Sequence, residues 1–211
     1  MALLHRATLR PTKLELLTAW LPDRPWYRGA GDPVRVTGFR FDDPDGEVGI
    51  ETLLVRAGDG PLLQVPLTYR AVPRPGGDAW LLGTAEHSVL GRRWVYDACG
   101  DPVYASALAA AILTGGHQAE EVMAEADGRL ERRAAAMYVA GSGMPGAEVP
   151  ASTAVVRVED ADPTTILTDV VELTVRRVLD GAAGPDAGPL ALTGTWSGQP
   201  VPVLLARAAL G

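Results

Sequence analysis

Apolar positions recur at helical spacing in two stretches of the chain and follow strand-like patterns in most of the rest. The first helix is predicted over residues 13–21, where leucines form one stripe. Thr12 and Glu15 have the spacing of a capping box, so this helix is expected to begin at once after Thr12. Pro22 ends it.

The second predicted helix covers residues 102–113 and is apolar on almost every side. Asp101 can cap its first turn and Pro102 suits its first position, while glycines at 115 and 116 end it. Because a helix without a polar face is normally buried, we expect it in the concavity of a sheet or between two lobes. Its other interpretation is a dimerisation or docking surface. A short polar helix is predicted over residues 120–126.

Runs with strand character follow the first helix and are separated by turns of Asp, Pro and Gly. The strands are predicted over residues 34–41, 48–56, 61–69, 79–82 and 93–98. They form a meander of antiparallel strands, with a bulge expected near Gly38, where the alternation is imperfect.

The rest of the chain is predicted to be rich in strands, with a hairpin turn at residues 197–199 and a Gly/Pro-rich connection over residues 180–189. The candidate strands cover residues 129–140, 153–159, 164–168, 170–179, 190–196 and 200–208. The predicted fold class is therefore α+β. Residues 1–127 are predicted to form one subdomain with a curved antiparallel sheet and two to three helices, and residues 128–211 to form a mainly antiparallel β subdomain.

The charge and the apolar segments exclude several classes of protein. A net charge of −7 argues against nucleic-acid binding, which depends on clustered cations. The longest apolar stretch, residues 103–113, is about half a membrane span, and the first residues lack the apolar run of a signal peptide. We therefore expect a cytoplasmic protein that does not enter a membrane. Cys99, the single cysteine, is expected to be a packed residue.

Motifs that usually carry chemistry are incomplete here. Residues 141–146 match G-x-G-x-x-G, but no helix of the required kind follows. The histidines, His5, His87 and His117, are far apart and lack a second metal ligand nearby. Ser88 and Ser106 are not in a nucleophile-elbow context. We predict no catalytic residue, no cofactor site and no metal site.

A group of aromatic side chains with nearby arginines is the candidate binding surface. It comprises Arg24, Trp26, Tyr27, Arg28, Arg93 and Trp94, with Trp20 and Tyr96 in the same group of aromatics. One interpretation is a packed core that anchors the first helix. The other is a platform for a carbohydrate or a protein partner, since aromatic faces and arginines suit both.

Three blocks in order resemble the N-terminal cap domain of bacterial maltokinases: residues 20–29 (WLPDRPWYRG), 64–69 (QVPLTY) and 87–98 (HSVLGRRWVYDA), the last followed by Asp101-Pro102. The resemblance covers about the first half of the chain. The second half resembles a reduced kinase N-lobe.

The resemblance implies that the machinery for phosphoryl transfer is missing. Leu173 or Thr174 occupies the position of the lysine that holds nucleotide phosphates in those kinases, and neither can supply its charge. The phosphate-side turn, residues 159–164, carries Asp160 and Asp162. The connection over residues 180–189 replaces the helix that orients the lysine, and the chain ends where a kinase passes into its C-lobe.

These observations lead to three expectations about function. The favoured one is a non-catalytic binding or regulatory protein, with a protein partner that the resemblance places in trehalose, maltose or glycogen metabolism, or with a second copy of the chain. The alternative is a sensor that holds a sugar or nucleotide in the cleft between the subdomains. An enzyme with unrecognised chemistry is the third.

Overall fold

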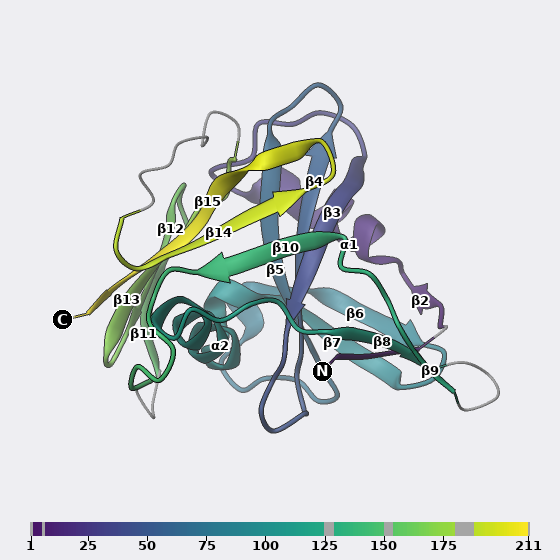
Figure 1. Cartoon of the computed structure of the whole chain (residues 1–211). Helices are drawn as coiled ribbons and strands as arrows, with labels where there is room; N and C mark the ends of the chain where they lie inside the picture. Colours follow the sequence, from purple (N-terminus) through teal and green to yellow (C-terminus); the bar gives the residue numbers. More distant parts are fainter. Residues whose placement is uncertain (1, 6, 125–128, 150–153, 180–187, 211) are drawn as a thin grey trace.

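The computed structural model describes residues 2–5, 7–124, 129–149, 154–179 and 188–210, and its architecture is mostly antiparallel β with two α-helices (Figure 1). The helices are α1, Lys13–Trp20, and α2, Pro102–Leu113. Both predicted caps are confirmed, because Thr12 and Glu15 form a capping box and Asp101 accepts a hydrogen bond from the Val103 amide. Within the described ranges, no helix has the length and hydropathy to cross a bilayer.

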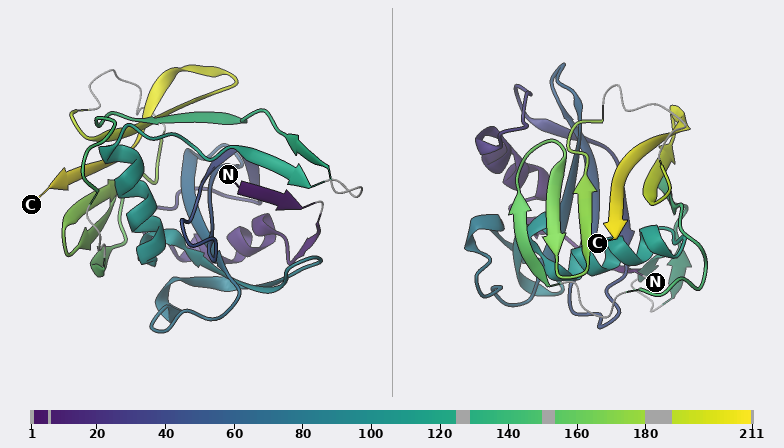
Figure 2. Two further views of the ribbon diagram at one scale, coloured as in Figure 1. Left: turned by 60° about the horizontal axis from the view of Figure 1, so that its bottom comes forward. Right: turned by 90° about the vertical axis from the view of Figure 1, so that its left-hand side faces the viewer.

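The first sheet contains six antiparallel strands in the order β2-β6-β7-β5-β4-β3 and curls into a half-barrel (Figure 2). Its strands are β2 Leu9–Arg10, β3 Pro33–Phe41, β4 Gly49–Ala57, β5 Leu62–Arg70, β6 Leu81–His87 and β7 Gly91–Asp97. The predicted irregularity in β3 is present, with the register shift between Arg35 and Thr37. Gly38 allows a close approach, since a Cβ atom there would lie 2.6 Å from the Thr52 carbonyl oxygen.

The second sheet contains six antiparallel strands in the order β10-β14-β15-β13-β12-β11. Its strands are β10 Met137–Gly141, β11 Val155–Glu159, β12 Thr164–Thr168, β13 Val171–Val175, β14 Ala191–Trp196 and β15 Gln199–Leu210. The predicted hairpin between β14 and β15 is confirmed, and Gly198 supplies the positive φ of 82° in its turn. A curved antiparallel sheet followed by a mainly antiparallel β part is thus the observed order, as predicted.

A small third sheet, in the order β1-β8-β9, was not expected. It joins β1 Ala2–His5 in parallel to β8 Glu121–Ala124, and β8 in antiparallel to β9 Leu130–Arg132. The helix predicted over residues 120–126 is therefore wrong where the structure describes it, while 125 and 126 lie outside the described residues. Residues 120–126 have good helix formers, but β8 pairs with β1 near the start of the sequence, and tertiary pairing overrides local propensity.

One apolar cluster joins α2 to both six-stranded sheets. Ile50 and Leu54 of the first sheet, Leu108 of α2, and Leu173 and Leu205 of the second sheet all belong to it. The prediction that the apolar helix is buried is confirmed, and it lies between the sheets. The predicted boundary at residues 127 and 128 and most of the 180–189 connection lie outside the described residues.

A second apolar cluster covers the other face of the first sheet. Leu17 of α1 packs there with Leu53 and Val55, which alternate with the residues that face α2. Each face of the first sheet is therefore covered by a helix. On the α1 side the helix covers only part of the sheet, and the remaining part is open and can form a site.

Candidate functional site

A cavity of about 1450 Å³ lies on the α1 face of the first sheet, next to the start of the helix. The first sheet supplies one wall, which includes Arg40, Glu51 and Tyr69, and α1 adds Lys13. The small sheet supplies the opposing wall through residues such as Glu121 of β8. The segments that enclose the cavity therefore come from widely separated parts of the sequence.

A buried carboxylate is the centre of the cavity's polar wall. Glu51 is 2% exposed, and its Oε2 accepts hydrogen bonds from Lys13 Nζ at 2.5 Å and from the Tyr69 hydroxyl at 2.9 Å. Arg40 Nη2 lies 3.1 Å from the same oxygen. Strand register explains the arrangement, because Arg40 is directly opposite Glu51 and Tyr69 is diagonal to it.

The charges in this cluster shift one another's pKa values. Burial alone would raise the pKa of Glu51, but Arg40 and Lys13 outweigh it and hold the pKa at about 2. Burial raises the pKa of Tyr69 well above its usual range, and the Glu51 charge adds to this. Burial lowers the pKa of Lys13, with Glu51 opposing and Arg40 adding to the lowering. The carboxylate is thus ionised at neutral pH and fixes the donors around it.

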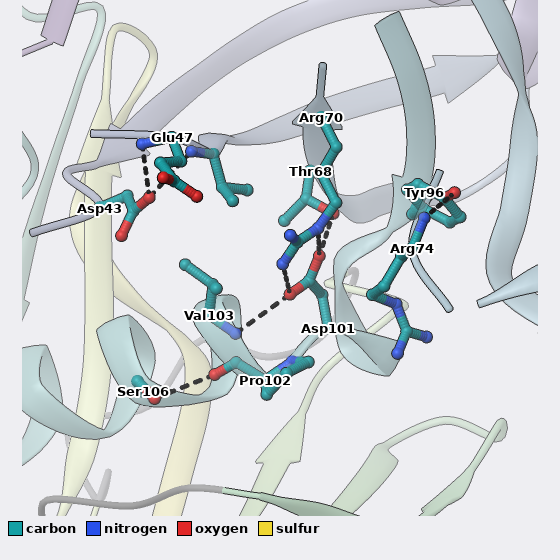
Figure 3. A network of polar contacts seen from close by, with 11 residues as sticks. Asp43, Glu47, Thr68, Arg70, Arg74, Tyr96, Asp101, Pro102, Val103 and Ser106 are labelled. Atoms are coloured by element: carbon teal, nitrogen blue, oxygen red, sulfur yellow. Dashed lines mark hydrogen bonds and ion pairs between the residues drawn. The ribbon is translucent and has the colours of Figure 1, made fainter. Parts of the chain in front are cut away.

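Several further charged side chains line the cavity. Arg35 and Arg93 add cations, and Glu121 lies 3.8 Å from Arg40 Nε. Asp43 also lines it, but its carboxylate accepts hydrogen bonds from the amides of residues 45, 47 and 48, part of which is drawn in Figure 3. The cavity therefore offers both cationic donors and carboxylate acceptors to a polar ligand.

Arg24 and Trp26, two of the predicted surface residues, contact the protein's own second sheet region. The Trp26 indole nitrogen donates to Asp160 Oδ1 at 2.7 Å, and Arg24 Nη1 lies 3.2 Å from Asp160 Oδ2. Trp26 is 4% exposed and packs edge-to-face on Trp20, whose ring also carries the Arg24 guanidinium at 4.7 Å. These contacts match the packing interpretation of the aromatic group.

The other predicted surface residues lie in different surroundings. Tyr27 is partly buried against the α1 cluster, and Arg28 is exposed and donates to the Pro25 and Tyr27 carbonyls. Arg93 and Trp94 are neighbours on β7, so their side chains point to opposite faces of the strand. Of the six, Arg93 is the one that lines the cavity.

The segment that supplies most of the cavity and of the aromatic group runs from Trp20 to Asp101. Residues 20–101 match the family model of the maltokinase N-terminal cap domain. No curated protein matches the chain. The resemblance stated for the first half is thus confirmed for this segment, which contains β3 to β7 and the cavity residues Arg40, Glu51, Tyr69 and Arg93. Lys13 precedes the cap domain, and α2 and the second sheet follow it.

A second buried ion pair joins the cap domain to the second sheet. Arg177 is fully buried, and its Nη2 lies 2.7 Å from Asp97 Oδ2, while its Nε donates to Thr164 Oγ1 at 2.7 Å. Its guanidinium stacks over Trp26 at 4.8 Å. Among the described residues, Arg177 Nη1 has no hydrogen-bond partner. This pair is a link between the sheets rather than part of the cavity.

Some residues stand at positions where the resemblance implies that kinase groups are missing. Their side chains make contacts within the fold. Leu173 is fully buried in the shared apolar cluster. Asp162 accepts hydrogen bonds from the Arg177 and Val178 amides, and Asp160 is held by Arg24 and Trp26. Cys99 is buried, and burial raises the pKa of its thiol well above the usual range, as a packed residue requires.

Sequence reasoning missed Lys13, Arg40, Glu51 and Tyr69 as site residues. The available signal was Glu51, a charged residue inside a strand that is otherwise apolar or uncharged up to Val55. Such a residue is costly unless it is paired, and it therefore points to partners on neighbouring elements. In the described part of the chain, no group of three or more potential metal ligands converges.

Proposed function

We propose that this chain is a non-catalytic binding protein with a regulatory role, and that its ligand occupies the charged cavity beside α1. The observation that carries the proposal is the buried Glu51 carboxylate with its three donors in the cavity wall. Because these groups hold one another in place without a ligand, the site is pre-organised, which lowers the cost of binding. The cap-domain match supports a place beside the enzymes of trehalose, maltose or glycogen metabolism.

Three contacts support a role without phosphoryl transfer. Leu173 packs in the core, Asp160 is paired with Arg24, and the Asp162 carboxylate caps backbone amides. None of these groups is oriented to bind a triphosphate or to accept a proton from a substrate hydroxyl. The contacts serve the fold instead.

The chemistry of the chain offers a direct test, because Lys13 is its only lysine. Reductive methylation followed by peptide mass spectrometry measures the reactivity of this one ε-amino group in the cavity. A panel of polar metabolites, sugars and nucleotides with magnesium is screened for slower methylation of Lys13 and for a higher melting temperature, since a ligand that binds only the folded state stabilises it.

We expect at least one compound to protect Lys13 and to stabilise the protein together. Glu51→Gln, which removes the charge that holds Lys13 and Arg40, should abolish the protection. Protection by no compound, or phosphate transfer from a nucleotide to a sugar, would refute the proposal.

A protein partner is the second candidate function. It is favoured by exposed apolar side chains on two edge strands that lie side by side: Val34 (59% exposed) and Val36 (47%) on β3, and Tyr138 (60%) on β10. Unpaired strand edges with apolar side chains are sites of protein association. Sedimentation analysis should detect a second copy, or a pull-down should capture a protein that Val34→Lys no longer binds. A monomer with unchanged captures by the variant would argue against it.

A further inference from the structure

We infer that the cavity recognises a small organic anion, that Lys13 and Arg35 hold its phosphate or carboxylate group, and that Arg93 adds a cation at another part of the same cavity. This inference rests on the proposed binding function and adds the chemical class of the ligand. It follows from which charged side chains of the cavity wall form ion pairs and which do not.

The cluster around Glu51 has more positive than negative charge. Lys13 and Arg40 share a single carboxylate oxygen, and Arg35 adds a third cation on the same face. Arg35 is opposite Val55, which packs in the α1 cluster, so the register places both on the face that carries Glu51. The Arg35 charge also lowers the pKa of Lys13, as expected for a nearby cation.

Arg93 brings a further cation to the same cavity from β7. Its neighbour two residues on, Val95, is opposite Tyr69, so Arg93 is diagonal to Tyr69 on that face of the sheet. Its guanidinium donates to the Arg92 carbonyl oxygen at 3.2 Å. Neither Arg35 nor Arg93 forms an ion pair with any residue that the structure describes.

Two of the acidic side chains that line the cavity are already engaged. Asp43 accepts three backbone hydrogen bonds, and Glu121 lies beside Arg40. Guanidinium groups without a carboxylate partner bind oxyanions through charge-assisted and often bidentate hydrogen bonds. Lys13 can add further N–H donors, because an ammonium group has three. The lining carboxylates of Glu47 and Glu131 can accept hydrogen bonds from hydroxyls of the same ligand.

The experiment compares three probes of similar size: glucose 6-phosphate, gluconate and sorbitol. Isothermal titration at low ionic strength measures the affinity of each, and Lys13 methylation reports whether binding occurs in the cavity. The variants are Arg35→Gln and Arg93→Gln. The matched control is Arg92→Gln, which makes the same charge change on the adjacent, exposed residue of β7, paired with Glu86 outside the cavity.

We expect an anionic probe to bind and protect Lys13 where sorbitol does not, with affinity falling as salt is added. Arg35→Gln should weaken binding by about tenfold and Arg93→Gln by a smaller factor, while Arg92→Gln leaves it unchanged. The phosphate and carboxylate probes identify which oxyanion is preferred. All three side chains are partly or fully exposed, so unchanged melting temperatures will show that the variants fold.

Three results would overturn the inference. In the first, Arg35→Gln and Arg93→Gln bind the anion as the control does. In the second, sorbitol binds and protects Lys13 as well as the anions do, which leaves the binding function standing and removes the anion specificity. In the third, none of the probes binds, and the wider metabolite panel then decides the binding function separately.

Discussion

Glu51 places a full negative charge in a strand that is otherwise apolar or uncharged up to Val55, and its partners determine what this costs in stability. The carboxylate is 2% exposed and is surrounded by Lys13, Arg40 and Tyr69. Since a buried charge without partners is strongly unfavourable, the four residues depend on one another. The stability of the protein should therefore respond to any change in their charges.

The depressed pKa of Glu51 predicts acid sensitivity. The pKa falls from an ordinary value of 4.5 to about 2 in the folded protein, so the ionised group stabilises the fold above about pH 4.5 and this contribution is lost as the pH falls toward 2. The shift corresponds to about 3 kcal/mol in the free energy of unfolding. Urea unfolding at a series of pH values measures it.

Glu51→Gln should lower the free energy of unfolding at neutral pH by about 2–3 kcal/mol, because two cations lose their partner. It should also flatten the pH dependence between about pH 4.5 and 2. Glu86→Gln, on the exposed pair with Arg92, is the matched control and should change little. Parallel pH profiles for the wild type and Glu51→Gln would show that Glu51 is not the group responsible.

The buried Arg177–Asp97 pair predicts strong coupling between two residues that are far apart in sequence. Arg177→Met or Asp97→Asn alone should each cost about 3–5 kcal/mol of unfolding free energy, because one buried charge is left without a partner. The double variant should cost clearly less than the sum. Urea denaturation of the four proteins measures the coupling, and additive effects would mean that the pair does not act as a unit.

At the scale of single residues, the sequence predicted only part of these side-chain contacts. Arg24 and Trp26 were recognised as members of an aromatic and basic group, but their partner Asp160 could not be identified from local pattern. Arg177 in a strand-like run gave no sign that it would be buried against Asp97. Such pairs depend on how the sheets pack, and one sequence does not encode that packing in any local spacing.

Among the elements, α2 depends most on a single polar residue. Asp101 accepts hydrogen bonds from the Val103 amide, the Thr68 hydroxyl and both Nε and Nη2 of Arg70 (Figure 3). The side chain therefore caps α2 and ties it to β5 at the same time. Its pKa is lowered, because the hydrogen bonds and charge of Arg70 outweigh burial.

Asp101→Asn should destabilise the protein by about 2–3 kcal/mol, more than the loss of an ordinary cap, because a charge-assisted bidentate pair is lost with it. Thermal and urea unfolding measure the change. Ser106→Ala, one turn further along the exposed side of α2, is the control and should stay within about 0.5 kcal/mol. Equal effects of the two substitutions would contradict the linking role of Asp101.

Periodicity and capping signals predicted both helices and most strands to within a few residues. They failed at residues 121–124, where helix-forming residues pair as β8 with β1. They also merged β9 and β10 into one predicted strand. Both errors have the same cause. The small third sheet forms by pairing between separate segments of the chain, and the alternation of apolar and polar residues within one segment does not reveal such pairing.

At the scale of the whole molecule, the two six-stranded sheets behave as one packed body. Gln64 of β5 donates to the Arg176 and Leu205 carbonyls, the latter on β15, and Leu63 forms a bridge with Val178. The α2 cluster continues this contact through the interior. Neither sheet buries its apolar face without the other.

We therefore predict a single cooperative unfolding transition. Tryptophan fluorescence, which reports mainly on the first sheet region, and far-ultraviolet circular dichroism should give the same urea midpoint. Trp196→Phe, which removes the tryptophan of the second sheet, should leave that midpoint nearly unchanged for both probes. Two separate midpoints would show that the sheets unfold independently.

The general architecture could be predicted because the alternation of apolar and polar residues and the turn residues are local signals in the sequence. The cavity could not be anticipated, since its walls combine the start of α1, all six strands of the first sheet and the small sheet. Only the unusual position of Glu51 indicated that charged partners were needed. Lys13 is the single lysine of the sequence, but its place beside Glu51 follows from how α1 packs on the sheet.

The position of Asp101 has a consequence for how the cap domain can be moved between proteins. The family match ends at this residue, one position before α2 begins. A segment cut there would keep the cap residue and lose the helix, and it would expose Phe39, Ile50 and Leu54 to water. In this chain the segment that matches the family model is therefore smaller than the unit that folds, and chimaeras should exchange this segment together with α2 and the sheet that packs on it.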